Sequence, residues 1–160
     1  MNPCPCGYYN SNFAGSVCRC LPQQVHNYQS RISGPLLDRF NMSICMEVDD
    51  SIKNQPAVSN LKDYWSAVFR ARSVQKLRYK KNLKSSTAFT TYFNGQVAEN
   101  DFQKITGLRP GRFSKPYNLM ISNRKHSQLL RIAQTIADLN DSHVIQEHFD
   151  EALYLQQYNL

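Results

Sequence analysis

Two amphipathic segments near the C-terminal end constrain the fold of this chain more than any other feature. Apolar side chains recur every three or four residues, first in residues 122–139 and again in residues 143–157. The side chains expected to face inward are Leu129, Ile132, Ala133, Ile136, Ile145, Phe149, Ala152 and Leu153. Ser122 stands where a helix cap belongs, and a polar turn at 140–142 separates the segments. The pattern predicts two antiparallel helices.

A longer helix is predicted ahead of this pair, over residues 61–80. Its apolar stripe consists of Leu61, Trp65, Val68 and Phe69, at spacings that repeat along one helical face. A short helix is expected over 99–105 and another over 117–121. Residues 82–98 are rich in Ser, Thr and Asn, and remain open between a loop and a short strand at 88–93.

The first third of the chain predicts smaller elements. Residues 1–20 form a loop, and Pro22 suits the first turn of a helix over 22–32. A helical turn follows over 35–39. The alternating pattern of residues 41–48 predicts one strand, in which Cys45 is a packed thiol.

These elements predict a mainly α protein in two parts. Residues 1–50 hold the loop, the short helices and the strand, and residues 51–60 form a polar linker that contains Pro56. Residues 61–160 form a helical domain that provides most of the stability. Its expected core is formed by Trp65, Phe69, Leu129, Ile132, Ile136, Ile145, Phe149 and Leu153.

Two Cys-x-Cys pairs occur in the N-terminal loop, Cys4 with Cys6 and Cys18 with Cys20. Four thiolates can hold a Zn²⁺ ion tetrahedrally, and a polar loop without a core of its own gains order from such an ion. Most structural zinc sites use Cys-x-x-Cys instead. The sequence therefore leaves two alternatives, a zinc site and a thiol-rich loop without metal.

One run of residues carries the whole net charge of +7. Residues 70–84 contain seven cations and no acid, whereas the other twelve cations balance twelve acids. Such a run favours either a solvated helix face or a surface that follows the phosphates of DNA, with Tyr79 stacking on a base. The candidate DNA contacts are Arg70, Arg72, Lys76, Arg78, Lys80, Lys81 and Lys84.

Several function classes find no support in the sequence. It contains no apolar run of the ~20 residues that span a bilayer and no apolar leader, which favours a cytoplasmic protein without a membrane partner. It also lacks a GxxxxGK[ST] phosphate loop and the hydrolase motifs HExxH and GxSxG. The chain on its own is therefore not expected to be an enzyme.

Five segments occur in an order that resembles the C-terminal part of the Mg-chelatase-like AAA+ ATPases of the bacterial competence protein ComM type. They are NPCPCG at 2–7, the second cysteine pair at 18–20, SGPLLDR at 33–39, SNRKHSQLLRIAQTIADL at 122–139 and EALYL at 151–155. The resemblance extends over nearly the whole chain and is weakest at 80–121.

The resemblance implies that residues 1–50 are the end of an AAA+ core and that 61–160 are its helical lid. Asn2 matches the sensor-1 asparagine, Arg39 the arginine finger that reaches a neighbouring subunit, and Arg124 the sensor-2 arginine of the lid. The implied cofactors are ATP and Mg²⁺, bound mainly by an ATPase core upstream. The implied partners are that core, the other subunits of a hexameric ring, and DNA.

The match has departures, and other functions remain open. The lid helix of the family usually has two further arginines, where this chain has Gln128 and Gln134. Their loss weakens the case for wider phosphate or DNA contacts by that helix. The alternatives are a stand-alone zinc-dependent nucleic-acid-binding module and a segment of a metal-chelatase ATPase subunit.

Overall fold

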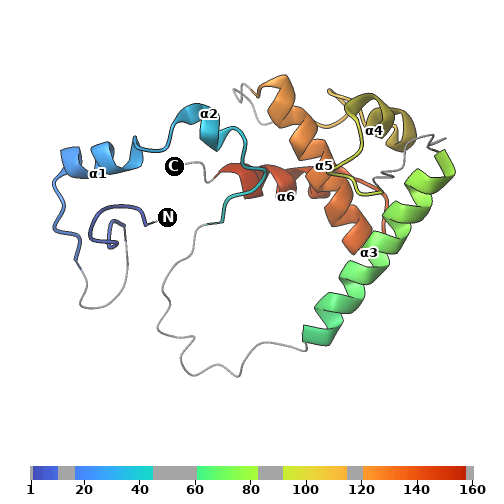
Figure 1. Cartoon of the computed structure of the whole chain (residues 1–160), viewed down its shortest axis with the longest axis horizontal. Helices are drawn as coiled ribbons and strands as arrows, with labels where there is room; N and C mark the ends of the chain where they lie inside the picture. Colours follow the sequence, from blue (N-terminus) through green and yellow to red (C-terminus); the bar gives the residue numbers. More distant parts are fainter. Residues whose placement is uncertain (1, 11–16, 45–60, 83–91, 115–120, 158–160) are drawn as a thin grey trace. The chain divides into compact units, whose positions relative to one another are not determined.

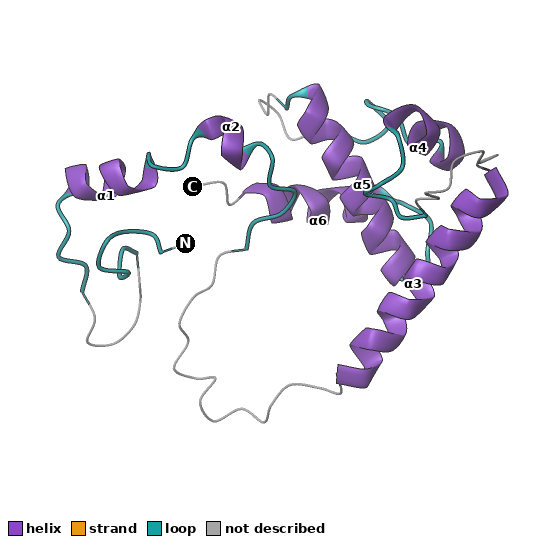
Figure 2. Ribbon diagram, viewed as in Figure 1, coloured by secondary structure: helices purple, strands orange, loops and turns teal. Residues whose placement is uncertain are grey.

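The computed structural model describes residues 2–10, 17–44, 61–82, 92–114 and 121–157. The chain divides into two compact units, unit 1 within Met1–Val58 and unit 2 at Ser59–Gln157. Helices are the regular elements of both units, and the described residues contain no strand (Figure 2). The expected mainly α class is confirmed.

In the part of unit 1 that the structure describes, two short helices form, α1 (Pro22–Gln29) and α2 (Gly34–Leu37) (Figure 1). Pro22 opens α1, because its missing N–H costs nothing in the first turn. The side chain of Gln24 accepts a hydrogen bond from the Leu21 N–H at 3.0 Å. Pro35 stands in the first turn of α2. Both helices fall where the sequence predicts them, although α1 ends earlier.

The strand expected over residues 41–48 is wrong for the part that can be judged. Residues 41–44 form a bend and irregular backbone, and residues 45–48, with Cys45, lie outside the described ranges. A strand needs a neighbour to pair its N–H and C=O groups. The described residues of unit 1 offer no second strand, so the alternating pattern has nothing to pair with.

The described residues of unit 2 form four helices, α3 (Leu61–Asn82), α4 (Glu99–Thr106), α5 (Asn123–Leu139) and α6 (Gln146–Gln157) (Figure 1). Helix α5 packs against α6 and α3, and α3 also contacts α4. The Ser122 hydroxyl accepts a hydrogen bond from the Lys125 N–H at 3.2 Å, which confirms the predicted cap. The helix expected at 117–121 falls almost wholly outside the described residues.

The core of unit 2 lies around α5. The predicted core residues Leu129, Ile136, Phe149 and Leu153 are buried there, and Ile132 packs partly buried against them. Loop residues and α4 complete the core with Val97, Phe102, Leu108 and Phe113. Ile145, by contrast, precedes the first turn of α6 and is 48% exposed, so its place in the core was wrongly predicted.

The apolar stripe predicted for α3 is also wrong as a core element. Trp65 is 54% exposed and Phe69 63% exposed. The residues of α3 that are buried come later in the helix: Ala71, Gln75 and Tyr79. Helix α3 thus packs through its C-terminal half, and its N-terminal half extends past the core.

Candidate functional site

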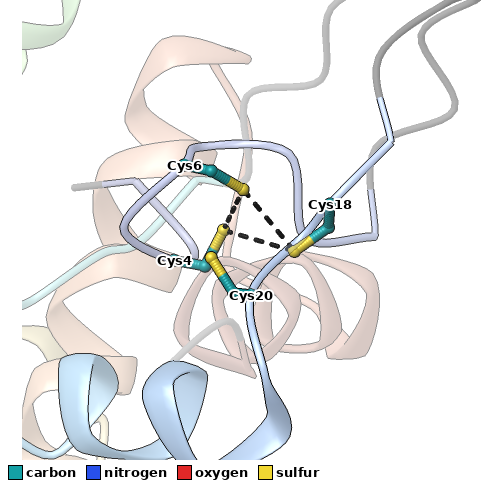
Figure 3. A group of neighbouring side chains, drawn as sticks. All are labelled: Cys4, Cys6, Cys18 and Cys20. Atoms are coloured by element: carbon teal, nitrogen blue, oxygen red, sulfur yellow. Dashed lines mark hydrogen bonds between the residues drawn. The ribbon is translucent and has the colours of Figure 1, made fainter.

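The four cysteines of the two Cys-x-Cys pairs lie together in unit 1 (Figure 3). Their sulfur atoms are all within 4.8 Å of one another. The Sγ atom of Cys4 lies 3.3 Å from that of Cys6 and 3.8 Å from that of Cys18, and the Cys6–Cys18 separation is 3.6 Å. These distances exclude disulfides, whose sulfurs are about 2.05 Å apart. We call these four residues the thiol cluster.

The spacing of the sulfurs suits a tetrahedral metal ion. Four thiolates at about 2.3 Å from Zn²⁺ place neighbouring sulfurs about 3.8 Å apart, the edge of the tetrahedron. The observed separations of 3.3, 3.6 and 3.8 Å are close to that edge. The thiol cluster therefore has the number, type and spacing of ligands that a structural zinc site requires.

A tight turn brings the first cysteine pair together. The Gly7 N–H donates to the Cys4 carbonyl at 3.1 Å, and Gly7 has a φ of +86°. Glycine adopts this left-handed conformation without the strain of a Cβ atom. The turn joins α1 through the Gln29 side chain, whose Nε2 donates to the Pro3 carbonyl at 3.1 Å.

The thiols of the cluster differ in pKa because they lie close together. A hydrogen bond from the Tyr8 backbone, helped by the Cys4 thiol, lowers the pKa of Cys6 to about 6. A hydrogen bond from the Cys6 backbone also lowers the pKa of Cys20. Partial burial and the side chains of Cys6 and Cys4 outweigh that hydrogen bond and raise the pKa of Cys20 to about 12. One thiolate therefore disfavours the next, and a divalent cation would remove that conflict.

The thiol cluster provides part of the small core of unit 1 that the structure describes. Among its described residues, Cys4 and Val25 are the buried hydrophobic ones, and the Cys4 side chain is fully buried. Small folded units with few buried apolar side chains, as in these described residues, are commonly stabilised by a staple such as a metal ion. This need, together with the sulfur geometry, favours a metal site over a plain thiol-rich loop.

The residues that match nucleotide-sensing positions lie on the surface of their units. Arg39 follows α2, is exposed, and donates from Nη1 to the Pro35 carbonyl at 2.7 Å. Asn2 is exposed beside the Gly7 turn. Arg124 is exposed in the first turn of α5. All three are groups of a kind that bind phosphate oxygens.

Some residues of the basic run are exposed to solvent, and others form contacts inside unit 2. Its exposed cations on α3 are Arg70, Arg72, Lys76, Lys80 and Lys81, whereas Lys84 lies outside the described residues. Arg78 and Tyr79, which are also predicted to contact DNA, are not exposed. Tyr79 is fully buried and its hydroxyl donates to the Asn94 Oδ1 at 2.6 Å, which rules out base stacking.

Arg78 belongs to a buried polar network. Its guanidinium forms a two-pronged ion pair with Asp138 on α5, with one N–H···O distance of 3.0 Å. Asn94 and Gln134 donate to the same carboxylate at 2.9 Å each. Gln134 therefore completes an internal network at a position where the resembled family usually has an arginine. Arg78 is therefore engaged in this internal ion pair and is not available as the DNA contact that the basic run predicts.

Sequence reasoning missed the exposed residues in the first half of α3. Lys62, Trp65 and Phe69 lie on one face with Arg72 and Lys76, at spacings of three and four residues. That spacing is visible in the sequence, but the apolar pattern alone predicts that the aromatic residues lie in the core. No helix among the described residues has the length and apolar character needed to cross a membrane.

Comparison with known proteins agrees with the division of the chain. Residues 1–54 match the family described as magnesium chelatase, subunit ChlI, and residues 62–156 match the family described as magnesium chelatase, subunit ChlI C-terminal. The competence protein ComM of Haemophilus influenzae is 32% identical over 156 residues. The uncharacterized protein YifB is 27% identical over 154 residues in Escherichia coli and 30% over 161 in Salmonella typhimurium.

Each of these matches covers 96% of the chain but 29% of the relative. The chain thus spans about three-tenths of the length of the curated relatives it matches. The C-terminal family model alone accounts for more than half of the chain and spans the four described helices of unit 2 except for Leu61 and Gln157 at their outer ends. The chain belongs to the magnesium chelatase subunit ChlI C-terminal family.

Proposed function

We propose that this chain is the nucleotide-sensing and lid portion of a cytoplasmic, ring-forming AAA+ ATPase that acts on DNA. The observation that carries the proposal is the tandem order of the two family matches, 1–54 followed by 62–156. Membership of the family supports an ATPase segment. The relative named competence protein supports a role in DNA handling, because competence is the uptake of DNA.

Three residues have roles in this proposal. Arg39 reaches the γ-phosphate bound by a neighbouring subunit, and Asn2 orients the attacking water in its own subunit. Arg124 binds the phosphates from the lid. Phosphoryl transfer is mostly positioning and charge stabilisation, so such residues can contribute from segments distant from the main ATP site. ATP and Mg²⁺ supply the reacting phosphate and its counter-charge when bound.

We propose further that Zn²⁺ binds the thiol cluster and stabilises unit 1. The sulfur separations and the small core around Cys4 support this assignment. The four thiolates hold the two ends of the loop at 4–20, next to α1. The metal therefore has a structural role, and Asn2 gains a fixed position two residues before the first ligand.

The proposal predicts that the purified 160-residue chain does not hydrolyse ATP by itself. A coupled phosphate-release assay with MgATP measures this directly. Metal-dependent turnover by the chain alone, lost in an Arg39→Ala variant, would contradict the assignment, because a finger that acts on a neighbouring site needs a complete site there.

A further inference from the structure

The exposed face of α3 combines aromatic and cationic side chains in a way that the fold of unit 2 does not use. Trp65 and Phe69 lie on this face with their ring centroids 6.1 Å apart and their planes tilted by 36°. Successive members are three or four residues apart, so they form one stripe along the helix. The members of this aromatic–basic stripe are Lys62, Trp65, Phe69, Arg72, Lys76 and Lys80.

This stripe is distinct from the stripe by which α3 packs. The packing stripe ends in the buried residues Ala71, Gln75 and Tyr79. Arg72, Lys76 and Lys80 of the aromatic–basic stripe each follow one of these buried residues by one position, which turns them about 100° around the helix. Trp65 and Phe69 continue this stripe toward the start of α3, and both are more than half exposed. They stand beside the packing face, among cations.

The positive charge around the stripe favours a polyanion as its binding partner. Helix α3 contains seven cations and one acid, Asp63, which lies off the stripe. Two copies of this face would repel each other, which argues against self-association through it. Arg72 is already oriented, since its guanidinium lies 5.3 Å from the centre of the Phe93 ring.

The combination fits a single strand of nucleic acid. Bases of any sequence stack on exposed aromatic rings, while lysines and arginines contact the backbone phosphates. From Lys62 to Lys80 the stripe extends about 27 Å along the helix axis, enough for several nucleotides. A duplex keeps its bases stacked inside and offers Trp65 and Phe69 no base face to contact.

We infer that the aromatic–basic stripe of α3 binds single-stranded DNA, with bases stacking on Trp65 and Phe69. The inference rests on the proposed action on DNA and assigns that action a site and a strand preference. Of the basic run, the site keeps Arg72, Lys76 and Lys80 and leaves out the buried Tyr79 and the ion-paired Arg78. It adds Lys62, Trp65 and Phe69 from the first half of α3.

The chain contains a single tryptophan, so its fluorescence reports on Trp65 alone. The full chain is titrated at low salt with a homothymidine oligonucleotide of about 16 nucleotides. The same length of duplex DNA serves as the comparison. We expect the single strand to quench the emission of Trp65 strongly and the duplex to leave it nearly unchanged.

Variants separate stacking from charge attraction. Anisotropy of a labelled oligonucleotide measures their affinity. Trp65→Ala and Phe69→Ala should each weaken binding of the single strand about 5- to 150-fold. Trp65→Phe, which keeps an aromatic ring, should retain most of the affinity. Leu77→Ala is the matched control, since Leu77 is 70% exposed on a different face of the same helix and should not contribute.

Three results would overturn the inference. Equal binding of single strand and duplex, without quenching and without loss in Trp65→Ala, would leave DNA as a partner but remove the stacking site. Absence of binding to either DNA at low salt would refute the proposed DNA partner itself. A Trp65 emission that changes with protein concentration in the absence of DNA would assign this face to contact between copies of the chain.

Discussion

Arg78 and Asp138 form a two-pronged ion pair across α3 and α5, between residues 60 positions apart in the sequence. The Asp138 side chain is only 1% exposed. Asn94 and Gln134 occupy further acceptor positions of the carboxylate. The pair therefore fixes α3 against α5, and it converts one member of a basic run into part of the core of unit 2.

Removal of one partner should destabilise unit 2 strongly. Asp138→Ala leaves the Arg78 guanidinium partly buried without its counter-charge, and we expect a loss of about 3–5 kcal/mol in the free energy of unfolding. Urea denaturation followed by circular dichroism measures it. Asp150→Ala is the control, because Asp150 is exposed on α6 and its loss should change stability by no more than about 0.5 kcal/mol. A similar small change for both variants would refute the structural role.

Arg72 and Arg78 should differ in their effect on DNA binding. Each phosphate contact contributes about one unit to the slope of log affinity against log salt. Arg72→Gln should reduce that slope by about one unit because its side chain is exposed on the aromatic–basic stripe. Arg78→Gln should leave the slope unchanged in protein that circular dichroism shows to be folded. Equal reductions would mean that Arg78 reaches the phosphates as well.

The thiol cluster should bind one Zn²⁺ per chain. Metal analysis of protein purified without chelators measures the number of zinc ions per chain. Cys4→Ser or Cys18→Ser should abolish zinc binding. Acid should release the ion, because each thiolate must be protonated for the metal to leave. Cys45→Ser is the control and should bind one equivalent as the wild type does. Less than a tenth of an equivalent in the wild type would contradict the assignment.

Loss of the metal should affect unit 1 alone. Unit 2 has its own core around α5, and none of the cluster ligands belongs to it. Addition of a chelator should broaden or shift the NMR resonances of α1 and leave those of α5 and α6 in place. Collapse of the α5 resonances on chelation would show that unit 2 depends on the metal too.

Glu99 should make the stability of unit 2 sensitive to acid. Burial alone would raise its pKa, but hydrogen bonds from Ser127 and Gln103 and the pairing with Arg131 at 3.0 Å outweigh it and hold the pKa below its ordinary value of 4.5. A depressed pKa in the folded state stabilises the protein above the unfolded value and loses that effect as pH falls through the folded value. Glu99→Gln should therefore flatten the decline in stability below pH about 4.5. An unchanged pH profile would contradict this role.

Local patterns in the sequence predict the helices and their buried faces better than they predict the contacts between helices. The Ser122 cap and the buried faces at Leu129 and Phe149 follow from spacing within one helix, which the sequence displays directly. Periodicity does not reveal how far a helix extends past its partner. For that reason the spacing predicts Trp65 and Phe69 in the core, although both are more than half exposed.

The candidate site was predictable to a similar degree. The two Cys-x-Cys pairs could be identified because ligand spacing within each pair is local, and the structure adds that both pairs converge. The role of Arg78 could not be identified, since Asp138 is 60 residues away and no local pattern joins them. The positions of Asn2, Arg39 and Arg124 came from resemblance, and their roles remain predictions.

The central claim is that Arg39 completes the ATP site of a neighbouring subunit, and a mixing experiment tests it most directly. It uses this chain joined to the upstream Walker-type core that the proposed function requires. Arg39→Ala subunits and subunits without their Walker-B acid should each bind ATP, yet neither should hydrolyse it alone. Mixed in equal amounts, they should recover a substantial fraction of the wild-type phosphate release, because the mixture contains sites with both an intact core and an intact finger. Wild-type turnover by Arg39→Ala alone, or loss of its ATP binding, would contradict the account.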